Sequence, residues 1–206
     1  MPPSPEKLMI MLLANTALFA VVALMCWGVE ELWGRLVARE GKRFFVNGRM
    51  RLLPALCFVA RQLPWILVVA IGLSALATLV AKRLGLDLPT QDMLKWLVGD
   101  TYSPLMKTSI VIFALVEAPF LEEIVFRRFL FRACHRYMPL WAAMFLSGCL
   151  FALMHCNALV FIPLVFVGGA FSWLYWRTGR LTAAMFAHFL FNATNVVLLL
   201  LFPEMA

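Results

Sequence analysis

Long apolar runs alternate with short polar and basic segments along this chain. A helix needs about 20 mainly apolar residues to cross the hydrocarbon core of a bilayer. The runs therefore predict about six membrane spans. They lie at 8–29, within 52–81, from about 108 onward, twice within 137–176, and at 181–202.

Two of these runs need their boundaries placed. The polar pair at 61–62 interrupts the second run, so we expect its membrane part at 63–81. The stretch 137–176 has no Asp, Glu, Lys or Arg and is too long for one span. It predicts two helices that turn near 156–157 or just before Pro163.

Two further segments carry a membrane signature. The first run is longer than the apolar core of a signal peptide and has no convincing cleavage site, so we expect an uncleaved span. Segment 91–98 has Met93, Leu94, Trp96 and Leu97 in the pattern of a short helix lying on the interface.

Composition gives the environment of this pattern. The chain has 206 residues, of which 64% are hydrophobic and 14% charged, whereas soluble domains carry about 25% charged residues. We therefore predict an all-α, polytopic transmembrane helical bundle in contact with a lipid bilayer. Its small size suggests a prokaryotic plasma membrane.

The chain has a formal net charge of +7, and its basic residues cluster in the short segments between the apolar runs. Basic and non-basic connections alternate, and the positive-inside rule then places both termini outside. This pattern explains the charge without nucleic acid, and we expect no nucleic-acid partner. The five cysteines are odd in number and form no CxxC pair, so they are predicted to be buried small hydrophobic residues. They are Cys26, Cys57, Cys134, Cys149 and Cys156.

Four ionisable residues lie in the third run, where each costs at least about 2–3 kcal/mol unless it faces the bundle interior. They are Glu117, Glu122, Glu123 and Arg127. Glu123 and Arg127 are four residues apart and can pair on one helix face, whereas Glu122 points about 100° away. Pro119 should kink this helix close to the carboxylates.

The later spans add further polar positions. His155 ends the fourth, and His188 and Asn192 lie four residues apart on one face of the last, which Asn195 continues. Each has a structural explanation: an interfacial histidine, a structural ion pair, or hydrogen bonds that join helices. Glu117 is expected to bond a neighbouring helix, and His135, among loop arginines, to be solvated.

Together these residues could perform peptide hydrolysis. That reaction needs a base that activates water, an acid for the leaving amine, and donors for the oxyanion. Desolvation favours the neutral form of a buried carboxyl group, which suits a group that takes and returns a proton. An imidazole can share the proton. Glu122, His155, His188 and Asn192 supply these parts, and we expect them to converge.

These residues resemble the three ordered motifs of the CPBP family. The motifs are Glu122-Glu123-x-x-x-Arg127, Phe151-x-x-x-His155 and His188-x-x-x-Asn192, with Ala118-Pro119 before the first and Gly168-Gly169 leading to the third. The family contains CAAX prenyl endopeptidases and relatives linked to bacteriocin processing and self-immunity. The resemblance covers roughly 105–200, which suggests N-terminal helices without a motif over 1–104 and a catalytic bundle over 105–206.

The resemblance implies an intramembrane endopeptidase of the glutamate type. Glu122 and His155 would activate water, His188 and Asn192 would form the oxyanion site, and Glu123 and Arg127 would orient the catalytic helix. The substrate would be a peptide or protein, such as a lipidated or membrane-anchored one. This sequence departs from the family at Arg128, where relatives often have glycine.

Three alternatives stay open at this point. The same scaffold could serve a non-proteolytic immunity or binding protein. Two histidines and a glutamate could hold zinc in a metal-dependent peptidase, although the chain has no HExxH motif and no cofactor is expected. A proton-coupled transporter would use buried Glu and His, but the chain shows no inverted repeat.

Overall fold

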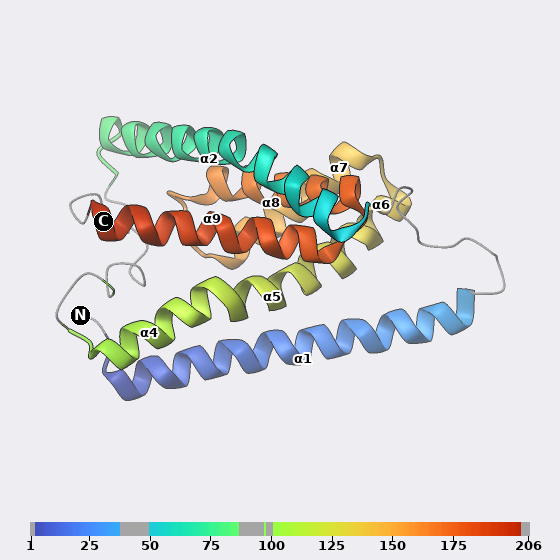
Figure 1. Ribbon diagram of the computed structural model, residues 1–206, viewed down its shortest axis with the longest axis horizontal. Coiled ribbons are helices and arrows are strands. Elements are labelled where there is room, and N and C mark those ends of the chain that lie inside the picture. Colours follow the sequence, from blue (N-terminus) through green and yellow to red (C-terminus); the bar gives the residue numbers. More distant parts are fainter. Residues whose placement is uncertain (1–2, 38–49, 87–96, 98–100, 203–206) are drawn as a thin grey trace.

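The computed structural model describes residues 3–37, 50–86, 97 and 101–202 (Figure 1), and this part of the chain contains helices and no strand. Six long helical runs follow one another, as the apolar pattern predicts. The first two are α1 (Pro5–Val37) and α2 (Leu52–Arg83), and the last three are α7 (Leu140–Met154), α8 (Phe161–Thr178) and α9 (Leu181–Leu201).

The third run is one continuous helical rod made of five pieces. These are α4 (Pro104–Ile112), η2 (Phe113–Glu117), α5 (Ala118–Glu123), η3 (Ile124–Phe131) and α6 (Arg132–Tyr137). Ser103 caps its start, because its hydroxyl accepts a hydrogen bond from Met106 N. The pieces η2 and η3 are π-helical, with wider turns than an α-helix.

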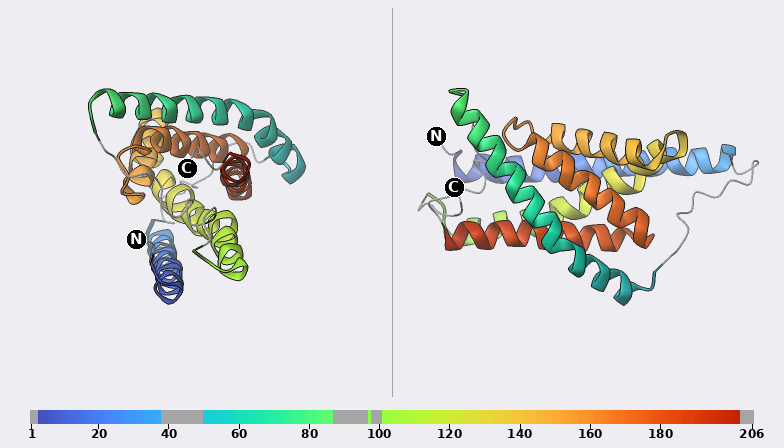
Figure 2. Two further views of the ribbon diagram at one scale, coloured as in Figure 1. Left: turned by 90° about the vertical axis from the view of Figure 1, so that its left-hand side faces the viewer. Right: turned by 90° about the horizontal axis from the view of Figure 1, so that it is seen from above.

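The helices pack in two groups around this rod (Figures 1 and 2). α2 crosses over α8 and α9, and α7 lies against α8. A buried cluster from α2, α8 and α9 includes Val59, Phe171 and Ala187. On the other side, α1 lies along the rod, and Leu8 packs with Ile110 of α4. The rod thus runs between α1 and the remaining helices.

Close approach of α7 and α8 depends on glycine. A Cβ atom at Gly168 would lie 2.9 Å from Gly148 Cα, and one at Gly148 would collide with Val165 O. Gly179, with φ 67°, ends α8 and donates its N–H to Tyr175 O. α9 begins two residues later. The tight turn at 179–180 therefore sets α9 against the end of α8.

Three described helices are long and apolar enough to cross a membrane: Pro5–Met25, Leu52–Arg83 and Leu181–Leu201. Large apolar side chains face outward, including Trp65 and Trp141, with 71% and 72% of their surface exposed. Such surfaces are covered by lipid in a membrane protein. The protein is an all-helical membrane bundle.

The element boundaries can be compared with the sequence expectation. α2 is one continuous helix through Arg61 and Gln62, the polar pair that interrupts the second apolar run. The turn after α7 lies at 155–160, as predicted. The predicted interfacial helix at 91–98 lies outside the described residues except for Leu97, which is helical and buried.

The cysteine prediction is partly wrong. Cys57, Cys134, Cys149 and Cys156 are free thiols, as expected, but none is buried. Cys57 and Cys156 are exposed, because the outer face of α2 and the turn after α7 have no helix packed over them in the described part of the chain.

Candidate functional site

Glu123 is the centre of a buried polar cluster at the end of α5. Its side chain is 0% exposed. Oε1 accepts a hydrogen bond from His188 Nδ1 at 2.8 Å and forms an ion pair with Arg127 Nη1 at 3.0 Å. One carboxylate oxygen therefore joins the rod to α9. The predicted pair of Glu123 and Arg127 is present.

Arg127 extends this cluster to α7 and α8. It is also 0% exposed, and its Nη2 donates to Gly168 O at 3.2 Å. Its guanidinium carbon lies 4.6 Å from the centroid of the Phe151 ring and 5.4 Å from that of Phe171. A carboxylate, a carbonyl and ring faces compensate the buried charge. Arg127 therefore has a positioning role in the packing of η3.

His188 is held on every side. It is 4% exposed, and its ring lies 5.1 Å from Phe171 and 5.8 Å from Phe151, centroid to centroid. Because the ionised Glu123 can only accept, Nδ1 is the protonated nitrogen. Nε2 then faces the second carboxylate, Glu122 Oε2, at 3.8 Å. That separation is too long for a direct hydrogen bond.

Glu122 and Glu123, which are adjacent in sequence, thus lie next to the two ring nitrogens of His188. The Glu122 side chain is 13% exposed, whereas that of Glu123 is fully buried. Glu122 Oε2 is buried without a hydrogen bond to any described residue. It therefore keeps its capacity to bind a water molecule or a proton.

Four ionisable side chains meet in this cluster: Glu122, Glu123, Arg127 and His188. An uncompensated charge in a low-dielectric interior is strongly unfavourable. The pairing of Glu123 with Arg127 therefore compensates the two fully buried charges.

His155 lies beside this cluster but does not join it. It follows the last residue of α7, and its Nδ1 lies 2.9 Å from Phe151 O. A carbonyl only accepts, so Nδ1 donates and Nε2 is left as an acceptor. The Phe151 ring lies 4.9 Å from the His155 ring and also touches that of His188. Within the described chain, His155 and Glu122 share no hydrogen bond.

Asn192 is directed at the backbone of the rod. Its Nδ2 donates to Ala114 O in η2 at 2.9 Å. The structure therefore brings together Glu122, Glu123, Arg127 and His188. The expected convergence of all four reacting side chains is only partly observed, because His155 and Asn192 bind main-chain carbonyls.

The remaining polar residues have local partners. Glu117 accepts a hydrogen bond from Thr16 of α1 at 3.1 Å, so it bonds a neighbouring helix as expected. Arg128 lies over the Phe129 ring at 5.8 Å. The prediction of a solvated His135 is wrong: the residue is half-buried and stacks on Phe131 at 5.7 Å, because α6 packs against α7.

Sequence reasoning missed the residues that frame the cluster. Phe171 carries no chemical signal, and Phe151 was noticed only as part of a motif. Gly168 contributes a carbonyl that no side-chain pattern reveals. A buried serine pair supports it: Ser172 Oγ donates to Gly168 O, while Ser147 Oγ donates to Phe126 O. Small polar residues inside apolar runs were the available signal.

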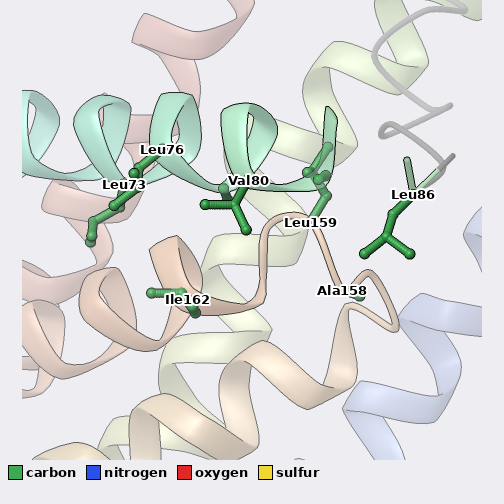
Figure 3. Close-up of a pocket in the computed structure, with 9 residues that line it drawn as sticks. Leu73, Leu76, Val80, Leu86, Ala158, Leu159 and Ile162 are labelled. Atoms are coloured by element: carbon green, nitrogen blue, oxygen red, sulfur yellow. The ribbon is translucent and has the colours of Figure 1, made fainter. Parts of the chain in front are cut away.

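The described part of the chain has no group of three His, Cys, Asp or Glu side chains that could hold a metal ion. A groove of about 260 Å³ lies elsewhere (Figure 3), between the end of α2 and the turn that connects α7 to α8. Leu76, Val80, Leu159 and Ile162 are among its apolar lining residues, and it contains none of the polar cluster.

Comparisons with known proteins match a part of the chain that contains the polar cluster. Residues 104–194 match the family described as type II CAAX prenyl endopeptidase Rce1-like. A protein of Bacillus subtilis (strain 168), provisionally described as the membrane peptidase YdiL, is 33% identical over 93 residues. This match covers 45% of the chain and 38% of the relative, so the chain spans well under half of that relative's length. No solved structure matches.

Proposed function

We propose that the protein is an intramembrane endopeptidase of the glutamate type, because residues 104–194 match the family described as type II CAAX prenyl endopeptidase Rce1-like. It hydrolyses a peptide bond in a membrane-anchored or lipidated peptide. The observation that carries this proposal is the approach of Glu122 Oε2 to His188 Nε2 at 3.8 Å, at an imidazole that Glu123 and Arg127 hold in place.

Glu122 is the general base in this proposal. In the proposed reacting state His188 is protonated on both ring nitrogens and Glu122 is ionised, and Glu122 removes a proton from water. The water oxygen then bonds to the substrate carbonyl carbon, and the electron pair of the C=O π bond moves to oxygen. His155 assists by accepting a hydrogen bond from the same water at Nε2, the nitrogen that its bond to Phe151 leaves free.

The oxyanion is stabilised by donors from α9. Nε2–H of His188 and the second amide proton of Asn192 supply them, and one such donor is typically worth about 3–4 kcal/mol. The C–N bond then breaks, and the proton held by Glu122 passes to the leaving nitrogen. The products are a free carboxyl group and a free amine, and Glu122 returns to its ionised state.

Glu123 and Arg127 act through His188. Glu123 fixes the orientation of the imidazole, as a carboxylate bonded to the other ring nitrogen does for many catalytic and metal-binding histidines. Arg127 forms an ion pair with Glu123 and donates a hydrogen bond to Gly168 O of α8. The reaction uses no metal ion in this proposal, and Glu122 carries the proton from water to the leaving nitrogen.

The protein is multi-pass and resides in a prokaryotic plasma membrane in this proposal. Three helices of sufficient length and the outward-facing apolar side chains support it. The arginines of α6 and Arg180, which precedes α9, lie at the end of the bundle where the rod finishes. By the positive-inside rule that end is cytoplasmic.

A comparison of peptide termini in cells tests the function without a known substrate. Membranes from cells that express the wild type or Glu122→Gln are analysed by mass spectrometry for new carboxyl termini. We expect a set of termini in membrane-anchored proteins that appears only with the wild type. Identical sets, at equal amounts of folded protein, would overturn the proposal and favour a non-proteolytic role for the scaffold.

A further inference from the structure

We propose that Asn192 is a positioning residue that replaces a backbone hydrogen bond removed by Pro119, and that it thereby fixes the helical register of Glu122 and Glu123. This inference rests on the proposed function for its catalytic consequence. The structural part stands on the backbone of the rod alone. It assigns to Asn192 a task in addition to that of an oxyanion donor.

The backbone hydrogen bonds around η2 leave one carbonyl without a helical partner. In an α-helix Ala114 O would accept from the N–H of Ala118, but that N–H donates to Phe113 O in the π-helical turn. The next candidate donor in a π-helix is residue 119, which is proline and has no N–H. Pro119 is fully buried, and Ala114 is half-buried beside it on the rod.

Asn192 satisfies this carbonyl from the neighbouring helix. Its Nδ2 lies 2.9 Å from Ala114 O. A buried carbonyl without a partner costs about 1–3 kcal/mol, and the cost rises inside a membrane because no water is available. The hydrogen bond from the Asn192 side chain therefore supplies the donor that the π-helical turn leaves the Ala114 carbonyl without.

The second π-helical segment also has a carbonyl that accepts a hydrogen bond from another helix. In η3 the carbonyl of Phe126 accepts a hydrogen bond from Ser147 Oγ of α7 at 3.2 Å. Both segments on either side of the glutamate pair thus have a carbonyl that takes its donor from another helix. This arrangement pins α5 from both sides.

Two contacts from α9 together determine the rotation of α5. His188 binds Glu123. Asn192 lies one turn further along α9 and binds Ala114 O, which lies about two turns before Glu123 on the rod. One contact would leave the rod free to turn about it, whereas two at different heights do not. Because Glu122 and Glu123 must face opposite nitrogens of one ring, a small rotation of the rod would misplace Glu122.

A double-mutant cycle tests this assignment. Its four proteins are the wild type, Asn192→Ala, Pro119→Ala and the double variant. A fifth protein, Asn195→Ala, is the matched control, because Asn195 lies on the same helix and makes no side-chain hydrogen bond in the described chain. Pro119→Ala restores an N–H that can donate to Ala114 O. Thermal midpoints in detergent and kcat and KM on a cleaved peptide are measured.

We expect Asn192→Ala to lower kcat by about tenfold or more, with a lower thermal midpoint. In the Pro119→Ala background the same substitution should lower the thermal midpoint by much less, while kcat still falls because the oxyanion donor is lost in both backgrounds. Equal losses of thermal midpoint in the two backgrounds would overturn the inference and leave Asn192 as an oxyanion donor alone. A wild type that cleaves nothing would instead remove the proposed function, while the coupling of thermal midpoints would still test the inference.

Hydrogen exchange gives a second test if Pro119→Ala does not fold. Peptides that cover 113–123 are followed by mass spectrometry in the wild type, Asn192→Ala and Asn195→Ala. The inference predicts faster exchange over 113–123 in Asn192→Ala and no change in Asn195→Ala. Unchanged exchange in Asn192→Ala would contradict it, whether or not any peptide is cleaved.

Discussion

Glu123 Oε1 lies 2.8 Å from His188 Nδ1, across 65 positions of sequence. This contact orients the imidazole, because a hydrogen bond from Nδ1 to Glu123 leaves Nε2 on the side of Glu122. It also explains the adjacent glutamates: one holds the imidazole and the other works with it. A single buried hydrogen bond therefore links the fold of the bundle to the proposed reaction.

Substitution of Glu123 by glutamine should destabilise the protein and reduce cleavage together. The amide cannot neutralise Arg127, and an unpaired buried charge costs about 3–5 kcal/mol. The neutral side chain also no longer fixes the His188 tautomer. The measurement is thermal unfolding in detergent beside peptide cleavage. Glu117→Gln is the control, since Glu117 is exposed and bonds only Thr16 in the described chain. A Glu123→Gln protein as stable as this control would contradict the account.

Two substitutions of Arg127 should differ in severity. Arg127→Lys keeps the charge beside Glu123 but loses the planar group that reaches Gly168 O and lies on Phe151, so we expect a loss of about 1–3 kcal/mol. Arg127→Met leaves Glu123 unpaired and should cost more, about 3–5 kcal/mol. Unfolding by denaturant or heat ranks the two variants. The reverse order would show that shape at this position matters more than charge.

Close packing of α7 on α8 gives a prediction with an internal control. A Cβ atom at Gly148 would collide with Val165 O and lie 3.1 Å from Gly169 N, whereas one at Gly72 meets nothing within 4 Å. Gly148→Ala should therefore lower the thermal midpoint. Gly72→Ala should leave it unchanged or raise it slightly, because alanine favours a helix by about 1 kcal/mol over glycine. Equal effects would contradict the packing described here.

Periodic features of this fold were predictable from the sequence. The last span, the turn at 155–160 and the pairing of Glu123 with Arg127 follow from apolar length and helical spacing, which are local properties. The membrane part of α2, expected at 63–81, stays a prediction; Arg61 lies on an exposed face of this helix, with its guanidinium carbon 5.7 Å from the Phe58 ring.

The sequence indicated candidate site residues, which stay a prediction, but it did not indicate their contacts. The sequence indicated Glu122, His155, His188 and Asn192, yet the partner of His188 is Glu123 and that of Asn192 is Ala114 O. The π-helical turns explain this gap. Each shifts the register of the residues that follow it, and no side-chain pattern indicates the shift. The assignment of 105–206 as a catalytic unit stays a prediction.

Removal of metal ions should leave the reaction unchanged. The proposed proton transfers involve only Glu122, His155 and His188, and no described group of side chains fits a metal ion. Cleavage is measured after dialysis against a strong zinc chelator and after zinc is added back. Rates within about twofold of each other are expected, because the protein supplies the base and the donors. Loss of activity that zinc restores would support the metal-dependent alternative.

The central claim is that Glu122, and not another intramembrane carboxylate, is the base that activates water. The most direct measurement compares single-turnover cleavage of one membrane-anchored peptide by Glu122→Gln and Glu117→Gln, with equal thermal midpoints verified for both. A missing general base predicts a rate at least about 10²-fold lower for Glu122→Gln, and a rate near the wild type for Glu117→Gln. A folded Glu122→Gln protein that cleaves as fast as Glu117→Gln would contradict the account.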